Sequence, residues 1–322
     1  MTWRTGVVLA GGRSRRFRER ASRDKLSIKV GGETSLCRVV KALSEVSEEV
    51  IISLKEEGAE VVLEALKECE TDVKLVFDPG FLKIEGPMIG IFSSSSLARG
   101  NVLVSSGDRP FLKPRLLERL YSEIERGSEV CTIVGPRGKV DPSLAAFDSN
   151  YLRLSSSLLI LLKRVKLTNL LRGASRISLL SPLKLEEEGC DLRGLINVNS
   201  PDDLAKDFSP SRAPEEDLNF SIKGGVQEAL REFHALVSER GWSSSSLEHP
   251  FWRGTVSLYF GAKLPELSTI AAEAFLEESE IYSELGLEYL KLQSLLDRLE
   301  ALDVDEEKEK LREKLRNIKS LE

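Results

Sequence analysis

The stretch TGVVLAGGRSRRF, residues 5–17, decides the fold class that we expect for this chain of 322 residues. Its first five residues are apolar or β-branched apart from one glycine, a composition typical of a buried strand. Gly11 and Gly12 then allow a tight turn whose successive amides point at an anion. Arg13 adds a guanidinium suited to phosphate oxygens. The stretch predicts a strand that leads into a phosphate-binding loop or into an ordinary glycine turn.

The segment after this turn is strongly basic. Between Arg13 and Lys25 there are seven basic residues and only two acids, Glu19 and Asp24. This density suits a nucleoside triphosphate better than a dinucleotide, and no Gly-Lys-Ser/Thr follows as in a Walker loop. An RNA-binding patch and a solvated loop would have the same composition, so the segment alone leaves all three interpretations open.

Short β-branched runs alternate with amphipathic helical segments up to about Leu204. We expect helices at 34–44, around 61–66 and after Pro114, and strands at residues 5–9, 49–54, 73–77, 101–105 and 129–134. This alternation implies right-handed crossovers and an α/β fold with a Rossmann-like, doubly wound, mostly parallel sheet. Ligands of such sheets bind outside the carboxyl ends of the strands. The loops after Leu9, Phe77 and Ser105 are therefore the expected site.

The last third of the chain differs in charge and pattern. Residues 1–208 carry 32 lysines and arginines against 29 acids, whereas residues 209–322 carry 14 against 23. The segment near residue 208 has the prolines of a linker, and leucines and tyrosines then recur at helical spacing from Leu276 to Leu302. We expect a first domain at 1–208 and a second, smaller, all-α domain at 209–322 that contains one long helix. The acidic domain would dock a protein partner, cover the substrate cleft or mediate self-association.

Composition argues against several other classes of protein. Two histidines, His234 and His249, and four scattered cysteines give little support to a zinc site, a disulfide framework or a Ser-His-Asp site. A formal net charge of −6 argues against a nucleic-acid partner. The N-terminus lacks a signal-peptide pattern and no stretch reaches the length of a membrane span, so we expect a cytoplasmic location and no membrane contact. Catalysis is left to carboxylates, lysine, arginine, backbone amides or a metal.

Two further segments place polar side chains at predicted strand ends. Asp108 follows the fourth strand, where its carboxylate would bind Mg²⁺ or cap a turn. Asn197 and Asn199 lie on a predicted short strand before Ser200, an expected helix N-cap. The two asparagines would hydrogen-bond their loop or complete a metal or ligand site.

Several segments, in this order and at these spacings, resemble the molybdenum cofactor guanylyltransferases, a family of nucleotidyltransferases. The resemblance covers about residues 5–204. Here Ser53 stands where the family often has an asparagine, Asp141-Pro142 replaces a His-Pro pair, and the loop before Lys25 is longer. The matching residues are Leu9-Ala10-Gly11-Gly12, Arg16-Phe17 with Asp24-Lys25, Asp78 with Gly86-Pro87-Met88-Ile89-Gly90, Asp108-Arg109-Pro110-Phe111, and Asn197-Val198-Asn199-Ser200-Pro201-Asp202-Asp203-Leu204.

The resemblance implies a nucleotidyltransferase fold and a role for each matching residue. Catalysis would depend on Arg13, Lys25 and Asp108, and Mg²⁺ would bind Asp108 with Asn199 as an additional ligand. The implied reaction transfers GMP from GTP to molybdopterin, a phosphorylated pterin, and releases pyrophosphate. The substrate-binding residues would be Leu9, Ala10, Gly11, Gly12, Lys25, Ser53, Asp78 and Asp108.

Two alternatives stay open. One is cytidylyl or other nucleotidyl transfer to a different phosphorylated acceptor, because the departures at Ser53 and Asp141 concern the base and the acceptor. The other is a non-catalytic GTP-binding assembly factor, in which the acidic domain would contact the partner. The two differ in whether pyrophosphate is released.

Overall fold

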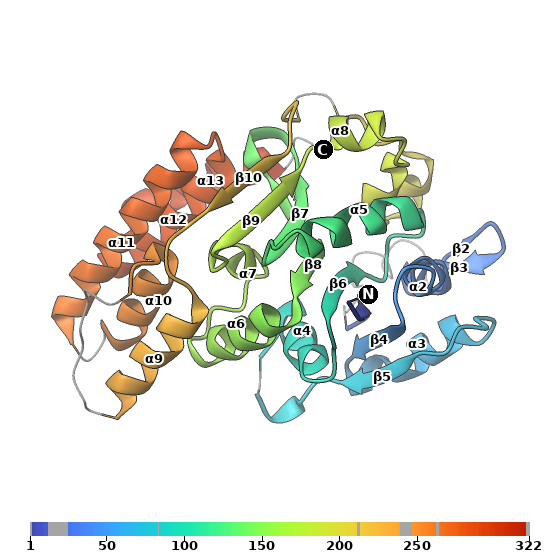
Figure 1. The fold of residues 1–322 in the computed structure, drawn as a ribbon, viewed down its shortest axis with the longest axis horizontal. Coiled ribbons are helices and arrows are strands. Elements are labelled where there is room, and N and C mark those ends of the chain that lie inside the picture. The colour runs from blue at the N-terminus through green and yellow to red at the C-terminus, as the bar shows by residue number, and fades with distance from the viewer. Residues whose placement is uncertain are drawn as a thin grey trace.

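The computed structural model describes residues 2–11, 25–82, 84–210, 213–238, 247–261 and 264–319. Its centre is an eight-stranded sheet in the order β10-β9-β7-β8-β6-β1-β4-β5. Figure 1 shows the C-terminal helices gathered at one end of the molecule, and α2 and α3 at the opposite end, beside β4 and β5. The strands of the sheet are β1 (Arg4–Leu9), β4 (Glu49–Leu54), β5 (Lys74–Phe77), β6 (Asn101–Ser106), β7 (Val130–Val134), β8 (Val140–Asp148), β9 (Arg176–Leu180) and β10 (Leu218–Ser221).

The pairing of these strands is mostly parallel. β1 pairs in parallel with β4 and β6, β4 with β5, and β7 with β9. The prediction of a doubly wound, mostly parallel sheet is confirmed, with its five predicted strands in place. β8 runs antiparallel to both β6 and β7, and β10 runs antiparallel to β9. Strand β8 was not predicted, because Asp141 and Pro142 interrupt its apolar pattern.

Alternate residues of the central strands point to opposite faces of the sheet. Val7 and Ile51 belong to one hydrophobic cluster, whereas their neighbours Val8 and Ile52 belong to a second cluster. All four side chains are buried. Central parallel strands are covered by helices on both faces, so they need continuous apolar runs rather than an alternating pattern.

Helices supply the cover on each face. The cluster around Val8 receives side chains from α2, α3, α5 and α8, and the cluster around Val7 receives them from α4, α6 and α7. The N-terminus of α2 is capped by Thr34, whose Oγ1 accepts a hydrogen bond from the amide of Cys37 at 3.2 Å. The bounds are α2 (Ser35–Ser44), α3 (Ala59–Leu66), α4 (Pro87–Ser95), α5 (Pro114–Glu125), α6 (Ser149–Leu161), α7 (Thr168–Arg172) and α8 (Pro182–Glu187).

The region after residue 208 is mainly helical, as predicted, with β10 as an added strand. The single long helix that we expected is wrong: the chain turns at Gly286, whose φ is +70°, and forms two helices. We call this pair, α11 and α12, the α11–α12 hairpin. Among the described residues no helix is long and apolar enough to cross a membrane. The helices are α9 (Val226–Val237), α10 (Pro250–Gly261), α11 (Pro265–Glu284), α12 (Glu288–Ala301) and α13 (Glu306–Lys319).

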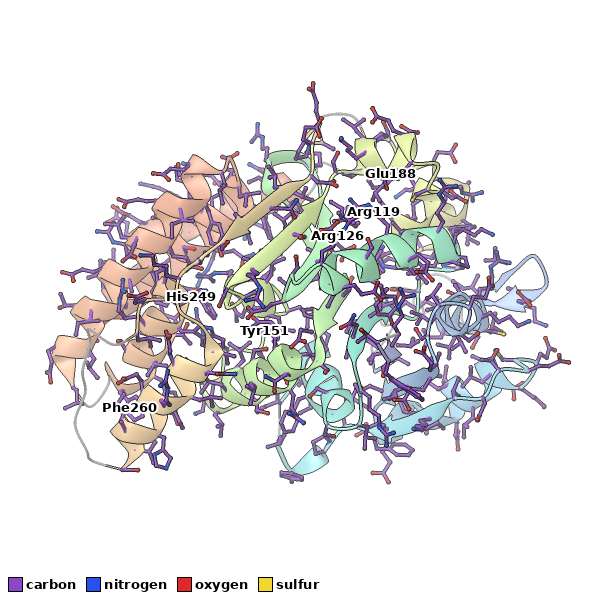
Figure 2. The ribbon with its side chains drawn as sticks, in the orientation of Figure 1. Arg119, Arg126, Tyr151, Glu188, His249 and Phe260 are labelled. Atoms are coloured by element: carbon purple, nitrogen blue, oxygen red, sulfur yellow. The ribbon has the colours of Figure 1, made fainter. Side chains whose placement is uncertain are left out.

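Aromatic and histidine side chains join this region to the sheet. Trp252 is fully buried, and its Nε1 donates to the carbonyl of Gly173 at 2.7 Å. His249 is also buried, with Nε2 3.2 Å from the carbonyl oxygen of Ala174. Burial lowers the pKa of His249 to about 4. Figure 2 shows His249 where the C-terminal helices meet the rest of the molecule, and its burial makes this histidine part of the core.

The sheet continues past the expected domain boundary. Asp217, just before β10, accepts a hydrogen bond from Arg119 Nη2 at 2.7 Å. Arg119 also donates through Nε to Glu188 at 3.0 Å, and Figure 2 shows both side chains beside α5. One hydrophobic cluster includes residues from both sides of residue 208. The division into domains at 1–208 and 209–322 stays a prediction, and so does a partner or self-association for the second.

Candidate active site

A cavity of about 280 Å³ lies at the carboxyl ends of β1, β4, β5 and β6. This is the edge of the sheet where parallel α/β folds bind ligands. Its lining combines lysines, carboxylates and serines with glycines and the apolar side chains of Leu9, Pro87 and Leu167. The lining residues are Leu9, Gly11, Lys25, Ser53, Lys55, Asp78, Glu85, Gly86, Pro87, Gly90, Ser106, Ser143 and Leu167.

Five residues predicted to bind the substrate meet in this cavity: Leu9, Gly11, Lys25, Ser53 and Asp78. They come from β1 and the turn after it, from the 3₁₀ helix Lys25–Ser27, from β4, and from the loop after β5. Because neighbouring parallel strands end at one edge, residues far apart in the chain are brought together there.

The other predicted residues lie around this cavity or outside the described residues. Ala10 is buried behind the lining, and its amide donates to the carbonyl of Ser53 at 2.8 Å. Asp108 is buried next to Lys25. Gly12 and Arg13 lie outside the described residues, so their roles stay predictions.

Asp78 is fixed by two hydroxyl groups. Its Oδ1 accepts hydrogen bonds from Ser53 Oγ at 2.8 Å and from Ser93 Oγ at 3.3 Å. Burial raises the pKa of Asp78 above its ordinary value, and the two hydrogen bonds and the charge of Lys55 oppose this only in part. The other oxygen, Oδ2, lies 3.4 Å from the position that a Cβ on Gly11 would occupy. The carboxylate therefore presents one oxygen toward the turn after β1.

Gly90 allows α4 to pack closely against this carboxylate site. A Cβ at Gly90 would lie 2.6 Å from Ser53 Oγ and 3.2 Å from Leu9 Cδ2. No real side chain is accommodated at 2.6 Å without displacing Ser53. Gly90 is thus required for packing at the cavity. Gly86, in the same segment, has a φ of +111°, a backbone conformation that favours glycine.

Lys25 and Asp108 form a salt bridge beside the cavity, in which Lys25 Nζ donates to Asp108 Oδ2. Asp108 is only 4% exposed. Burial would raise the pKa of Asp108, but the charge of Lys25 and its hydrogen bond outweigh burial and lower it. Asp108 is consequently an anion at neutral pH, although it is almost wholly buried. Its Oδ1 has no hydrogen-bond partner among the described residues.

The two asparagines near residue 198 occupy different surroundings. Asn197 Oδ1 accepts from Ser106 Oγ at 3.0 Å, and the amide of Val198 donates to the carbonyl of Asp108 at 2.8 Å. Asn199 is exposed, and its Nδ2 lies 3.5 Å from the carbonyl of Asn197. The predicted short strand here is wrong: this segment connects two 3₁₀ helices, Leu192–Leu195 and Pro201–Ala205. Asn199 as a metal ligand stays a prediction.

The expected cap at Ser200 is present. The first helical residue is Pro201, and Asp203 Oδ2 accepts from the amide of Ser200 at 2.7 Å and from that of Asn199 at 2.8 Å. The helix is a 3₁₀ helix. This turn holds the 197–199 segment against the Asp108 loop.

The part of the cavity wall that includes Ser143 and Leu167 was not predicted. Ser143 Oγ donates to Asp141 Oδ1 at 2.6 Å, and Asp141 forms a salt bridge with the fully buried Arg109. Arg109 Nη1 also donates to the carbonyl of Leu195 at 2.7 Å. Ser143 and Leu167 line the cavity, Ser143 from β8 and Leu167 from just before α7. The position of Ser106 at the end of a predicted strand would have indicated a place at the site. Nothing in the sequence around Leu167 indicates one.

The fold and this site define a class of protein. A glycine turn after the first strand, a lysine, and a buried anionic carboxylate at the end of a neighbouring parallel strand are the groups that handle a nucleoside triphosphate and its metal. These are the features of a nucleotidyltransferase. The chain belongs to the family of the MobA-like NTP transferase domain, whose model matches residues 6–177, and it is a nucleotidyltransferase.

Relatives with similar sequences cover about three fifths of the chain. A probable molybdenum cofactor guanylyltransferase of Thermococcus gammatolerans is 28% identical over 207 residues, which are 62% of this chain and 97% of the relative. The protein of the same name from Pyrococcus horikoshii is 28% identical over 62% of this chain and 95% of its own length. A solved nucleotidyl transferase from a Methanothermobacter species aligns with a TM-score of 0.48 and 22% identity, over 63% of this chain and 94% of that one.

Proposed function

We propose that this nucleotidyltransferase transfers GMP from GTP to the phosphate group of molybdopterin and releases pyrophosphate. One observation carries the proposal: Leu9, Gly11, Lys25, Ser53 and Asp78 converge on a single cavity from separate elements. The names of the relatives, probable molybdenum cofactor guanylyltransferases, support GTP and molybdopterin as the substrates.

We assign one side of the cavity to the nucleotide and the other to the acceptor. The nucleotide half is built by β1, β4, the loop after β5 and the start of α4, and it carries the five converging residues. The acceptor half is built by Ser106, Ser143 and Leu167. We place the base and ribose near Asp78, which presents a carboxylate oxygen toward Gly11. The acceptor phosphate would then approach from the side of Ser106 and Ser143.

Asp108 fits a divalent cation. A buried, anionic carboxylate with one oxygen on Lys25 and the other without a partner among the described residues has one coordination position to offer. Mg²⁺ typically takes one or two carboxylates in such sites and fills its other positions with water and phosphate oxygens. Asp108 would hold the ion, with Asn199 as the additional ligand that the sequence predicts. When bound, Mg²⁺ neutralises charge on the triphosphate oxygens.

The residues of this chain contribute positioning and charge. An oxygen of the acceptor phosphate forms a new bond to the α-phosphorus of GTP, while the bond from that phosphorus to the bridging β-phosphate oxygen breaks. The electron pair leaves with pyrophosphate. Lys25 would stabilise the charge on the leaving group, assisted by the Gly11 amide and, in the segment outside the described residues, by Gly12 and Arg13. A site without histidine or a serine nucleophile suits this reaction, because phosphoryl chemistry depends mainly on alignment and charge.

The test uses purified full-length protein with Mg²⁺ and each of the four nucleoside triphosphates, with and without molybdopterin. Pyrophosphate release and the mass of the pterin product are measured together. We expect release with GTP, dependent on molybdopterin, and a product heavier by one GMP unit. EDTA should abolish the release.

Other outcomes would identify an alternative. Preference for CTP would mean that the hydroxyl of Ser53, which donates to Asp78, belongs to a site for a different base. Turnover only with another phosphorylated acceptor would keep the chemistry and change the substrate. Tight GTP binding without pyrophosphate release under any condition would favour a non-catalytic assembly factor and contradict the proposal.

A further inference from the structure

Besides the neighbouring helices α10 and α13, the α11–α12 hairpin contacts two segments that lie close in sequence to residues of the cavity wall. One is the 3₁₀ turn Pro136–Gly138, which leads into β8. The other is the segment from Arg164 to Arg172, which includes α7. Two residues of the acceptor half of the cavity belong to these segments or follow them: Ser143 follows the first segment on β8, and Leu167 lies within the second. The family match ends at residue 177, so the hairpin lies outside it.

The first contact is a backbone-to-backbone approach. A Cβ on Gly138 would lie 2.5 Å from the Cα of Leu287, the N-cap residue of α12 after the turn of the hairpin. Gly138 also has φ of +70°, so no other residue fits here without moving the hairpin away. Ser143, on the cavity wall, lies on the strand that this turn begins.

The second contact is a buried polar interface. Thr168 Oγ1 donates to Gln293 Oε1 at 2.8 Å, and both side chains are buried. The residue before Thr168 is Leu167, which lines the cavity. A buried hydrogen bond thus joins the first residue of α7 to α12.

A charge cluster reinforces the second contact. Arg172 Nε donates to Glu278 Oε1 at 2.8 Å, and Arg172 Nη1 donates to Asp297 Oδ2 at 2.7 Å. Arg164 forms a further salt bridge with Asp297. The side chains of Arg172 and Glu278 are 2% and 0% exposed, so this pair is fully buried, and Arg164 closes the cluster at 14% exposure. It connects the two ends of the Leu167 segment to both helices of the hairpin.

We propose that the α11–α12 hairpin is a positioning element for acceptor binding: it fixes the Gly138 turn and the Leu167 segment, and so sets the places of Ser143 and Leu167 in the cavity. The lining residues of the nucleotide half come from other elements, namely β1, β4, the loop after β5 and the start of α4, whereas the hairpin contacts the Gly138 turn and the Leu167 segment. The hairpin therefore acts on acceptor affinity and leaves nucleotide affinity unchanged. The assignment of the acceptor half depends on the function proposed above.

Two variants test this in the full-length protein. Gly138→Ala places a methyl group against Leu287, and its control is Gly127→Ala, because Gly127 also has positive φ, +106°, but would have no neighbour within 4 Å. Thr168→Val removes the hydrogen bond to Gln293 and keeps the shape of the side chain. Hydrogen–deuterium exchange is followed in peptides containing Ser143, Leu167 and Asp78, together with the KM for GTP and for molybdopterin.

We expect faster exchange, by about tenfold, in the peptides with Ser143 or Leu167 and no change in the peptide with Asp78. The KM for molybdopterin should rise by about tenfold, since a tenfold change needs only the loss of one well-placed contact. The KM for GTP should stay within twofold of the wild type, and Gly127→Ala should change none of these quantities.

Equal acceleration in both halves would mean that the hairpin only stabilises the whole fold, and it would overturn the proposal. Unchanged exchange around Ser143 and Leu167 in Thr168→Val would do the same. Failure of the proposed function would look different, because the wild type itself would not transfer GMP to molybdopterin. The exchange measurements would still test the hairpin in that case. The effect on KM would then be measured with the acceptor that the wild type uses.

Discussion

Lys25 and Asp108, 83 residues apart in the chain, form a salt bridge that holds an almost fully buried carboxylate in its charged form. Lys25 is the more accessible partner, with 22% of its side chain exposed against 6% for Asp108. Lys25 is therefore able to reach a ligand in the cavity, whereas Asp108 offers Oδ1, which has no hydrogen-bond partner in the part of the chain that the structure describes. In the proposed reaction, Lys25 would contact the triphosphate and Asp108 would bind the metal ion.

The first prediction concerns this pair. Asp108→Asn and Lys25→Ala should each lower kcat by about 10²–10³, because each removes one charged contact from the transition state. The measurement is steady-state pyrophosphate release, with circular dichroism to check folding. Lys29→Ala is the matched control, since Lys29 forms a salt bridge with the exposed Glu68. If Asp108→Asn kept wild-type turnover, its role at the metal would be wrong.

The second prediction concerns Gly90. In Gly90→Ala the new methyl group would meet Ser53 Oγ, so Ser53 must move and release Asp78. We expect GTP affinity to fall by about tenfold, measured by calorimetric titration, and the free energy of unfolding to fall by about 1–3 kcal/mol. Gly58→Ala has no neighbour within 4 Å and should bind GTP as the wild type does. Normal GTP binding by Gly90→Ala would remove Ser53 and Asp78 from the nucleotide site.

Most of the central sheet was predictable because its strands are buried on both faces and therefore read as continuous apolar runs. The site residues at the ends of β1, β5 and β6 were predictable for the same reason, since strand ends fix the positions of Gly11, Asp78 and Asp108. β8 was not, because the polar residues Asp141 and Ser143 near its start contact Arg109 and interrupt the apolar pattern. Leu167 was not either: it reaches the cavity through contacts of its neighbours with a hairpin more than a hundred residues later.

The third prediction concerns the pH dependence of stability at Asp78. Its pKa is raised in the folded protein, so the folded state binds this proton more tightly than the unfolded state and loses stability as pH rises through that pKa. Asp78→Asn should therefore be more stable than the wild type at pH 7, and the gain should shrink as pH falls toward the ordinary carboxyl pKa. GTP affinity should fall by about tenfold or more.

Urea unfolding across this pH range measures the effect at Asp78, with the exposed Asp72→Asn as control. A gain in stability together with a loss of GTP binding would mark Asp78 as a residue kept for its ligand at a cost in stability. An Asp78→Asn variant that is less stable than the wild type at pH 7 would contradict the assigned direction of the shift.

The last prediction concerns the buried charge cluster under α7. Arg172→Met leaves Glu278 and Asp297 buried with less positive charge, and it should lower the free energy of unfolding by about 3–5 kcal/mol in urea titrations. The double variant Arg172→Met/Glu278→Leu should recover part of that loss, because it removes the stranded carboxylate along with its partner. Arg312→Met, from an exposed pair, should cost less than about 1 kcal/mol. The result that would contradict this is additivity: the double variant would be less stable than Arg172→Met by as much as Glu278→Leu alone destabilises the wild type. Arg172 and Glu278 would then act independently, and the cluster would not join the α11–α12 hairpin to the Leu167 segment.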